Sequence, residues 1–226
     1  MLNIAIDGPS GSGKSTVAKL LSEKLNVLYL DTGAMYRACA VKARDEGVDL
    51  NSAAMVDALA EKIRVTIAYV GGEQITYLDG KDVSKTIREN EISLLASKIS
   101  AYRSIREKMV EAQREVARTN DCILDGRDVG TNVLPNAKFK FFVTASIEVR
   151  AERRFKELAA RGETVDIETL KKEMQQRDYQ DAHREISPLK QAKDAVLIDT
   201  SNLTVNEVLD KILSIISDKA KVNAKR

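Results

Sequence analysis

Residues 8–15 read Gly-Pro-Ser-Gly-Ser-Gly-Lys-Ser, a complete phosphate-binding loop of the G-x-x-x-x-G-K-[ST] type. The apolar run at 3–7 predicts a short buried strand before the loop, and the periodic run at 15–25 predicts an amphipathic helix after it. Glycines let backbone N–H groups close around an anion, and the helix N-terminus adds partial positive charge. Together they predict a nucleoside-triphosphate site at the edge of an α/β sheet.

The side chains of this loop have the chemistry that a triphosphate and its metal ion need. Lys14 can reach the β- and γ-phosphates, and the Ser15 hydroxyl can bind Mg²⁺. An acidic residue at the end of a neighbouring strand orients such an ion, often through water, and Asp125 is the candidate. The expected donor-binding residues are Gly8, Pro9, Ser10, Gly11, Ser12, Gly13, Lys14, Ser15 and Thr16.

Composition limits the possible classes of function. The 226 residues suit one compact α/β unit with an inserted subdomain. A net charge of +2 gives no overall field for nucleic acid or a membrane surface. The one histidine, His183, excludes a multi-histidine metal site, while Cys39 and Cys122 lack zinc spacing and are expected as buried free thiols. With no leader and no long apolar run, we expect a soluble cytoplasmic protein.

Strand and helix patterns alternate along the rest of the chain, which favours a parallel sheet wrapped by helices. Two β-rich stretches at 63–68 and 74–78, joined by Gly71-Gly72-Glu73, predict an inserted antiparallel hairpin within roughly residues 62–85, and 79–82 reads as a turn. The polar, basic stretch 219–226 is expected to be frayed. Further strands are expected at 27–30, 122–124, 139–145 and 195–199, and helices at 34–46 with Thr32 as N-cap, 88–116, 147–160, 166–184 and 205–216.

Two segments at strand ends carry further candidate residues. In 30–37, Leu-Asp-Thr-Gly-Ala-Met-Tyr-Arg, Arg37 either clamps a second phosphate or is a surface arginine. In 125–131, Asp-Gly-Arg-Asp-Val-Gly-Thr, Arg127 and Asp128 lie in a glycine-flanked loop. Ligands of open α/β sheets bind at the carboxyl ends of strands, so a functional role is favoured over a local ion pair.

A basic helix follows the fourth expected strand of the sheet. Arg150, Arg153 and Arg154 share one face of it by the i, i+3, i+4 rule. Glutamates interleave with them, so a solvated salt-bridge face is one interpretation. We favour the other, a lid whose closure brings arginines to the transferring phosphoryl group and expels water.

The next helix carries a second charged stripe. Arg177, Asp181 and Arg184 are spaced i, i+4, i+7. They form either an intrahelical salt-bridge ladder, or a set in which arginines bind phosphate and the carboxylate binds ribose hydroxyls. The neighbouring His183 lies off this stripe and is expected at the surface.

Four of these segments, at 6–16, 30–37, 125–131 and 177–184, together resemble the bacterial cytidylate (CMP) kinase family of nucleoside monophosphate kinases. The resemblance implies a P-loop NTPase-type five-stranded parallel sheet with helices on both faces, an inserted antiparallel β/helical NMP-binding subdomain and a short lid. It implies one domain over 1–226, divided into a core (1–61, 119–148 and 185–226), an NMP-binding insert (about 62–118), a lid (about 149–165) and a substrate-contacting helix (166–184).

The resemblance also implies a role for each residue that matches the family's motifs. Ser97 and Arg106 enter only in this way, since composition gives them no distinction. Thr32 stands where some members have serine and keeps the hydroxyl. The implied base-reading residues are Thr32, Ser97, Arg106 and Asp128; those for the CMP phosphate are Arg37, Arg127 and Arg184; those for the sugar are Arg177 and Asp181; and the catalytic residues are Lys14, Arg127, Arg153 and Arg154.

The implied reaction is phosphoryl transfer from ATP, with Mg²⁺, to CMP or dCMP, giving ADP and CDP or dCDP in pyrimidine nucleotide metabolism. The acceptor phosphate has a second pKa of about 6, so it is mostly a dianion at pH 7 and needs no general base. Small molecules are the only expected partners, and we expect a monomer. Three alternatives stay open. They are a hydroxyl kinase of the shikimate or gluconate type with Asp31 as base, a GTPase-type nucleotide switch, and a UMP/CMP dual kinase. The sequence has no guanine-reading motif, which counts against the GTPase.

Overall fold

The computed structural model describes the backbone of residues 1–223 and the side chains of all of these except 90 and 219–223. The central sheet has the strand order β2-β6-β1-β7-β8, and each neighbouring pair is parallel. The predicted parallel α/β sheet is therefore confirmed. Its strands, within the described residues, are β1 (Asn3–Asp7), β2 (Leu28–Asp31), β6 (Cys122–Gly126), β7 (Phe139–Thr144) and β8 (Val196–Asp199).

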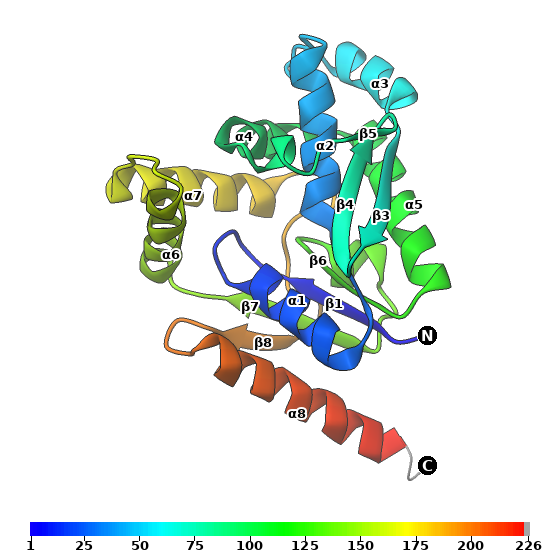
Figure 1. Cartoon of the computed structure of the whole chain (residues 1–226), viewed down its shortest axis with the longest axis vertical. Helices are drawn as coiled ribbons and strands as arrows, with labels where there is room; N and C mark the ends of the chain where they lie inside the picture. The colour runs from blue at the N-terminus through cyan, green and yellow to red at the C-terminus, as the bar shows by residue number, and fades with distance from the viewer. Residues whose placement is uncertain (224–226) are drawn as a thin grey trace.

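Helices cover both faces of this sheet (Figure 1). Successive side chains of β1 point to opposite faces, so Ile4 and Ile6 enter one hydrophobic cluster and Ala5 the other. The Ile4 side packs against α1 (Lys14–Leu25) and α8 (Val205–Asn223), and the Ala5 side packs against α2 (Thr32–Asp45) and α5 (Arg103–Thr119).

The inserted hairpin is part of a second, three-stranded antiparallel sheet with order β3-β4-β5. Its strands are β3 (Val65–Val70), β4 (Glu73–Leu78) and β5 (Lys81–Asp82). A turn was expected over 79–82, but residues 81 and 82 form the short strand β5. The helix before the insert, α3 (Ala53–Lys62), was not predicted.

The helix predicted over 88–116 is two helices instead of one. A 3₁₀ turn (Thr86–Arg88) leads into α4 (Asn90–Ile99), and α5 begins at Arg103. Arg106 Nη1 donates to the Ser100 carbonyl over 3.0 Å, and the Tyr102 hydroxyl donates to the Leu50 carbonyl. These contacts hold the residues between the two helices in a non-helical conformation. A periodic pattern of apolar residues cannot reveal such contacts.

The last helices follow the prediction more closely. Helix α6 (Ile147–Ala160) and helix α7 (Ile167–His183) pack against each other and project beside the end of β7 (Figure 1). Helix α8 continues through 219–223, where a frayed tail was expected, and 224–226 lie outside the described residues.

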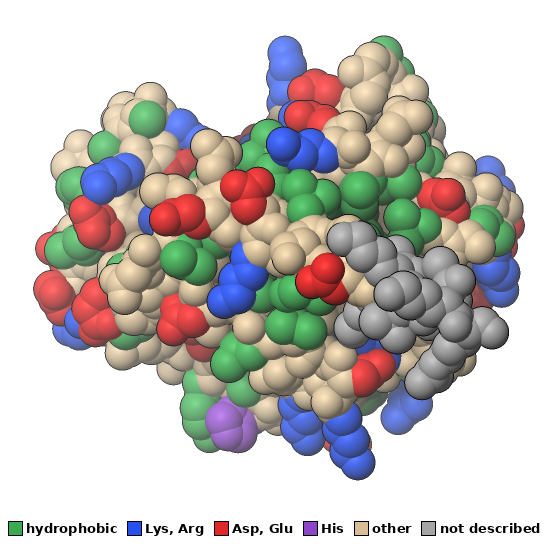
Figure 2. All heavy atoms as spheres, turned by 90° about the horizontal axis from the view of Figure 1, so that it is seen from below, with side chains coloured by type: hydrophobic (Ala, Val, Ile, Leu, Met, Phe, Trp, Pro, Cys, Tyr) green, Lys and Arg blue, Asp and Glu red, His purple; other side chains and the backbone are tan. Residues whose placement is uncertain are grey.

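The surface and the cysteines agree with the composition. On the face shown in Figure 2, acidic and basic side chains are interspersed. Cys39 and Cys122 are buried free thiols, as predicted, and His183 is exposed. None of the described helices is long and apolar enough to cross a membrane.

Candidate active site

A cleft of about 830 Å³ opens at the carboxyl edge of the central sheet. Among the predicted site residues, Gly8, Pro9 and Arg150 lie outside its lining. The structure brings all the others together around this one space. They are Ser10, Gly11, Ser12, Gly13, Lys14, Ser15, Thr16, Thr32, Arg37, Ser97, Arg106, Asp125, Arg127, Asp128, Arg153, Arg154, Arg177, Asp181 and Arg184.

The loop after β1 has the backbone of an anion cradle. A Cβ at Gly8 would lie 1.9 Å from the Val143 carbonyl oxygen, so only glycine allows β1 and β7 to approach here. Gly13 is the N-cap of α1, and no side chain in the described part of the chain caps the first turn. The N–H groups of that turn are therefore available to an anion in the cleft.

Lys14 lies at the base of this cradle. Its Nζ donates to the Pro9 carbonyl over 3.3 Å, and the residue is 7% exposed. Burial, helped by the nearby Arg127, lowers the pKa of the Lys14 ammonium to about 7. A bound phosphate would supply the negative charge that favours the protonated form.

Ser15 and Asp125 meet as the sequence predicted. The Ser15 hydroxyl donates to one oxygen of the Asp125 carboxylate, and the Tyr29 hydroxyl donates to the other over 3.2 Å. Burial raises the pKa of Asp125, and the nearby Asp31 adds to this effect. A buried carboxylate beside a hydroxyl fits the oxygen ligands that Mg²⁺ prefers.

Other metal ligands are scarce. Among the described residues, no group of three or more His, Cys, Asp or Glu side chains could hold a metal ion. An ion held at Ser15 would therefore need phosphate or water oxygens for its remaining ligands.

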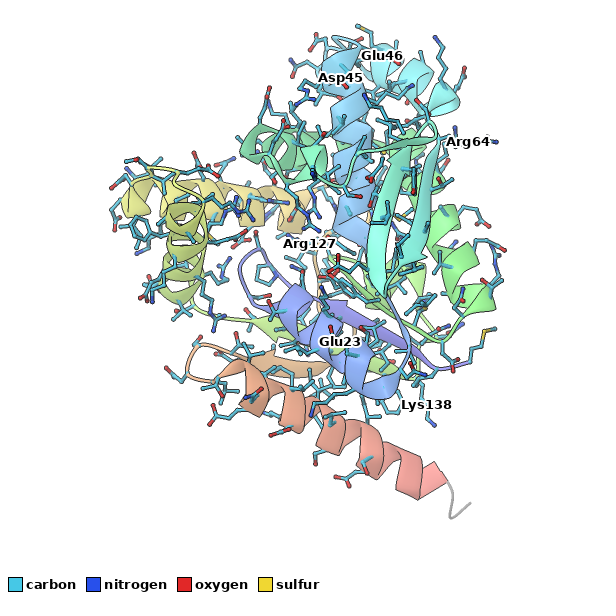
Figure 3. The ribbon with its side chains drawn as sticks, in the orientation of Figure 1. Glu23, Asp45, Glu46, Arg64, Arg127 and Lys138 are labelled. Atoms are coloured by element: carbon cyan, nitrogen blue, oxygen red, sulfur yellow. The ribbon has the colours of Figure 1, made fainter. Side chains whose placement is uncertain are left out.

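The far side of the cleft is built from ion pairs between expected substrate residues. Asp128, 5% exposed, accepts from Arg106 Nη2 over 2.5 Å and from Arg184 Nη2 over 3.4 Å. Asp181 accepts from Arg127 Nε over 2.9 Å. Arg127 lies near the centre of the molecule, between α7, α2 and the first strand (Figure 3).

The arginines outnumber their counter-charges. Burial opposes ionisation of Asp181, but Arg127 and Arg177 lower its pKa below the ordinary value. Burial, together with Arg127, lowers the pKa of Arg177 to about 10. Such crowding of like charge favours the binding of an anion.

Several polar atoms of the cleft wall are buried and have no hydrogen-bond partner within the described residues. Buried polar groups are nearly always paired, so unmet capacity gathered in one cleft indicates a polar ligand. Tyr36, which the sequence interpretation did not single out, is among them. The atoms are Ser12 Oγ, Tyr36 Oη, Arg37 Nε, Ser97 Oγ, Arg106 Nε and Arg177 Nε.

The N-cap of α2 is Asp31, and the prediction of Thr32 for this position was wrong. Asp31 Oδ1 accepts from the Ala34 N–H over 3.0 Å, whereas the Thr32 hydroxyl donates to the Asp125 carbonyl over 2.7 Å. Asp31 Oδ2 also accepts from Arg37 Nη2 over 2.5 Å. Although burial opposes it, Arg37 lowers the pKa of Asp31, which makes this carboxylate a poor general base.

The three arginines of α6 do not share one role. Arg153 donates to the Thr200 side chain and carbonyl over 3.0 and 2.8 Å. Arg154 pairs with Glu157 over 2.9 Å, and it lines the cleft as Arg153 does. The expected lid role fails for Arg150, which lies outside the cleft lining and donates to the Ser10 carbonyl over 3.1 Å.

Arg184 departs from the predicted helical stripe. It is the C-cap of α7 and has extended backbone angles, φ −61° and ψ 142°. Its Nε donates to the Ser187 carbonyl over 2.7 Å, and its Nη2 turns to Asp128. Arg177 and Asp181 remain in the helix and line the same cleft.

Two residues that hold the site were missed by the sequence interpretation. Asp7, 4% exposed, accepts from the N–H groups of Val129 and Gly130 over 2.8 and 2.7 Å. Gln74 of β4 accepts from the Asp31 N–H over 2.7 Å and donates to the Asp31 carbonyl over 3.4 Å. A charged residue at the end of an apolar strand was a usable signal for Asp7, whereas Gln74 had none.

Comparison with known proteins shows similarity along nearly the whole chain. A family model described as cytidylate kinase matches residues 4–218. The cytidylate kinase of Lactobacillus gasseri is 49% identical over 221 residues, which cover 98% of this chain and 96% of that protein. The cytidylate kinase of Bacillus licheniformis is 48% identical over 221 residues, which cover 97% and 98%.

Solved structures resemble this one in fold alone. A gluconokinase from Sinorhizobium meliloti has a TM-score of 0.52 at 15% identity, covering 99% of this chain and 95% of its own. A shikimate kinase from Bacteroides thetaiotaomicron has a TM-score of 0.50 at 14% identity, covering 96% and 98%. Identities this low carry no information about the acceptor.

Proposed function

The chain belongs to the cytidylate kinase family, and on that premise we propose that it transfers the γ-phosphoryl group of ATP to CMP or dCMP. The observation that carries the proposal is the division of one cleft into two halves. One half is an anion cradle with Lys14 at its base. The other half holds buried arginine–aspartate pairs, together with arginine and hydroxyl groups that have no hydrogen-bond partner among the described residues.

In the donor half, the loop of residues 8–16 binds the phosphates of ATP through its N–H groups, and Lys14 neutralises the β- and γ-phosphates. Bound Mg²⁺ would withdraw charge from the same phosphates, with Ser15 as ligand and Asp125 behind it, through water. The Ser15–Asp125 hydrogen bond supports this assignment.

In the acceptor half, the cytosine edge meets Thr32, Ser97, Arg106 and Asp128. Two observations support this role: the Ser97 hydroxyl has no partner within the described residues, and the Arg106–Asp128 pair is buried. A wrong base would leave such groups without hydrogen bonds in the complex. Arg37, Arg127 and Arg184 bind the acceptor phosphate, and Arg177 and Asp181 contact the sugar.

Catalysis in this proposal consists of bringing two anions together and cancelling their charge. Lys14 and Arg127 do so from the floor of the cleft, and Arg153 and Arg154 do so from α6. The acceptor dianion attacks without a general base. The pairing of Asp31 with Arg37 agrees with this, since the carboxylate is not free to take a proton.

We propose a separate role for each part of the chain. The insert of about 62–118 binds the acceptor, 149–165 acts as the lid, and 166–184 contacts the substrate, on a core of 1–61, 119–148 and 185–226. We also propose that the protein acts as a monomer, since the residues assigned to the donor and to the acceptor are all supplied by this chain. A cytoplasmic location is part of the proposal, because ATP and CMP are metabolites of that compartment.

The test is ADP release from ATP and Mg²⁺ with CMP, dCMP, UMP, AMP, GMP and shikimate offered separately. Turnover with CMP and dCMP alone is expected. Comparable turnover with UMP would make the protein a dual kinase, and turnover with shikimate would replace the proposal by a hydroxyl kinase.

A further inference from the structure

We propose that Asp7 and Arg114 are positioning residues that clamp the turn directly after Arg127 and Asp128, and so set the geometry of the acceptor half. The inference rests on the proposed function, because it assigns those two residues to the acceptor nucleotide. Neither Asp7 nor Arg114 lines the cleft. Each would act through the turn and not by touching a substrate.

The clamped element is a single π-helical turn, Val129–Val133, directly after Asp128. Its Leu134 N–H donates to the Val129 carbonyl over 2.7 Å. Turns of this kind are rare and less stable than α-helix, and they need outside support. The turn also contacts the site directly, because Asn132 Nδ2 donates to Asp128 Oδ2 over 3.0 Å.

Asp7 holds the first end of the turn. Its two carboxylate oxygens accept from consecutive N–H groups, those of Val129 and Gly130, over 2.8 and 2.7 Å. The fit is close, because a Cβ at Gly130 would lie 3.3 Å from Asp7 Oδ2 and 3.2 Å from Lys140 Cδ. Asp7 is 122 residues from Val129 in sequence, yet its carboxylate accepts from N–H groups that have no carbonyl partner within the turn.

Arg114 of α5 holds the other end. Its Nε donates to the Val133 carbonyl over 3.1 Å, and its Nη2 donates to the Asn132 carbonyl over 2.8 Å. A carboxylate thus meets the N–H end and a guanidinium meets the carbonyl end, which is the arrangement that the dipole of a helical turn favours. Four hydrogen bonds fix a segment of five residues.

The two anchors come from elements that already serve the site. Asp7 directly precedes Gly8 of the phosphate loop, and Arg114 shares α5 with Arg106, the partner of Asp128. The clamp therefore fixes the position of Arg127 and Asp128 relative to the phosphate loop through Asp7, and relative to helix α5 through Arg114. Small displacements of reacting groups lower rates strongly, so we expect this fixed arrangement to matter for phosphoryl transfer.

The experiment compares Asp7→Asn and Arg114→Met with two matched controls. Asp121→Asn also removes a carboxylate that accepts a backbone N–H, that of Leu2, but at an exposed position. Arg118→Met lies one turn further along α5, where the arginine pairs with exposed glutamates. For each protein, amide hydrogen exchange over 127–133 and KM values for CMP and ATP are measured.

Both clamp variants should speed exchange over 127–133 and raise KM for CMP about tenfold, since Asp7→Asn removes one hydrogen bond of the turn and Arg114→Met removes two. KM for ATP should stay within about twofold. The controls should match the parent protein. Equal rises in KM for ATP and CMP would overturn the proposal, and unchanged exchange would do so too. If Asp7→Asn does not fold, Arg114→Met tests the same turn from its other end.

The exchange measurement also separates this inference from the proposed function. If the parent protein does not phosphorylate CMP, the proposed function fails while exchange still decides whether the turn is clamped. If CMP is phosphorylated and KM for CMP does not respond in either variant, the clamp fails while the proposed function stands.

Discussion

Arg127 Nε donates a hydrogen bond to Asp181 Oδ2 over 2.9 Å, across 54 positions of sequence. This bond joins the loop after β6 to helix α7, and both residues line the cleft. The residue assigned to the acceptor phosphate is thus held by the residue assigned to the sugar. A change at either one should affect more than its own contact.

Replacing Asp181 should distinguish the two acceptors. If Asp181 binds the 2′-hydroxyl, Asp181→Ala should lower kcat/KM for CMP about tenfold more than for dCMP, which lacks that group. Both should also fall because Arg127 loses its partner. The measurement is kcat/KM for each nucleotide, with Asp178→Ala on the same helix as control, since Asp178 pairs with Arg150 outside the cleft. Equal losses for CMP and dCMP would remove the sugar contact.

Replacing Arg106 should relax base selectivity. Arg106→Ala leaves the buried Asp128 with weaker partners, so the preference for CMP over UMP should fall by about tenfold or more. Breaking the buried ion pair should also lower stability by about 3–5 kcal/mol. Activity is therefore compared at a temperature where circular dichroism shows a folded variant. The exposed Arg103, on the same helix, gives the control Arg103→Ala. An unchanged CMP/UMP ratio would exclude Arg106 from base recognition.

Replacing Lys14 should separate catalysis from stability. Lys14→Ala should lower kcat by about 10²–10³, because the cleft loses a charge that stabilises the transferring phosphoryl group. Unfolding by urea should change little, since removing a buried ammonium also removes its desolvation cost. Lys24→Ala, at an exposed position in the last turn of α1 and outside the cleft lining, is the control. Unaltered turnover would contradict the role of the phosphate loop.

Asp7 should make stability depend on pH. Burial raises its pKa from 3.8 to about 7 in the folded protein. The folded state then binds the proton more tightly than the unfolded state, so this contribution to stability is complete below pH 4 and is lost as pH rises through 7. At about 1.4 kcal/mol per pKa unit, the loss is on the order of 4 kcal/mol.

Urea unfolding of the parent protein and Asp7→Asn from pH 4 to pH 8 measures this loss. The free energy of unfolding of the parent should fall relative to that of the variant across the interval. The hydrogen bonds lost by the variant add a constant difference and do not change the slope. Parallel curves would show that Asp7 titrates as an ordinary carboxylate.

Much of the cleft was predictable because motifs that follow parallel strands must meet at one edge of the sheet. Asp125 lies near the end of β6, Arg127 and Asp128 directly follow that strand, and Lys14 follows β1, the strand beside it. Local order in the sequence therefore translated into proximity in space. The roles of Ser97 and Arg106 came only from the family resemblance, since nothing in their neighbourhood marks them.

The failures have a common physical cause, which is that partners distant in sequence decide local structure. Asp31 and Thr32 are adjacent and both can cap a helix; the choice follows from Thr32 reaching the Asp125 carbonyl and Gln74 holding the Asp31 backbone. The break between α4 and α5 likewise depends on Arg106 binding the Ser100 carbonyl. Such contacts leave no periodic trace in the sequence.

The hydrogen bond from Tyr29 to Asp125 has a spectroscopic consequence. The chain has no tryptophan and six tyrosines, and two of these, Tyr29 and Tyr36, line the cleft. Phenol emission responds to the hydrogen bonding and charge around the hydroxyl, and Asp125 and Arg106 contact these two rings. A change in the hydrogen bonding or charge around either ring is therefore expected to alter tyrosine emission. A tryptophan introduced by mutation would be the chain's only indole, and its emission could be excited apart from that of the six tyrosines.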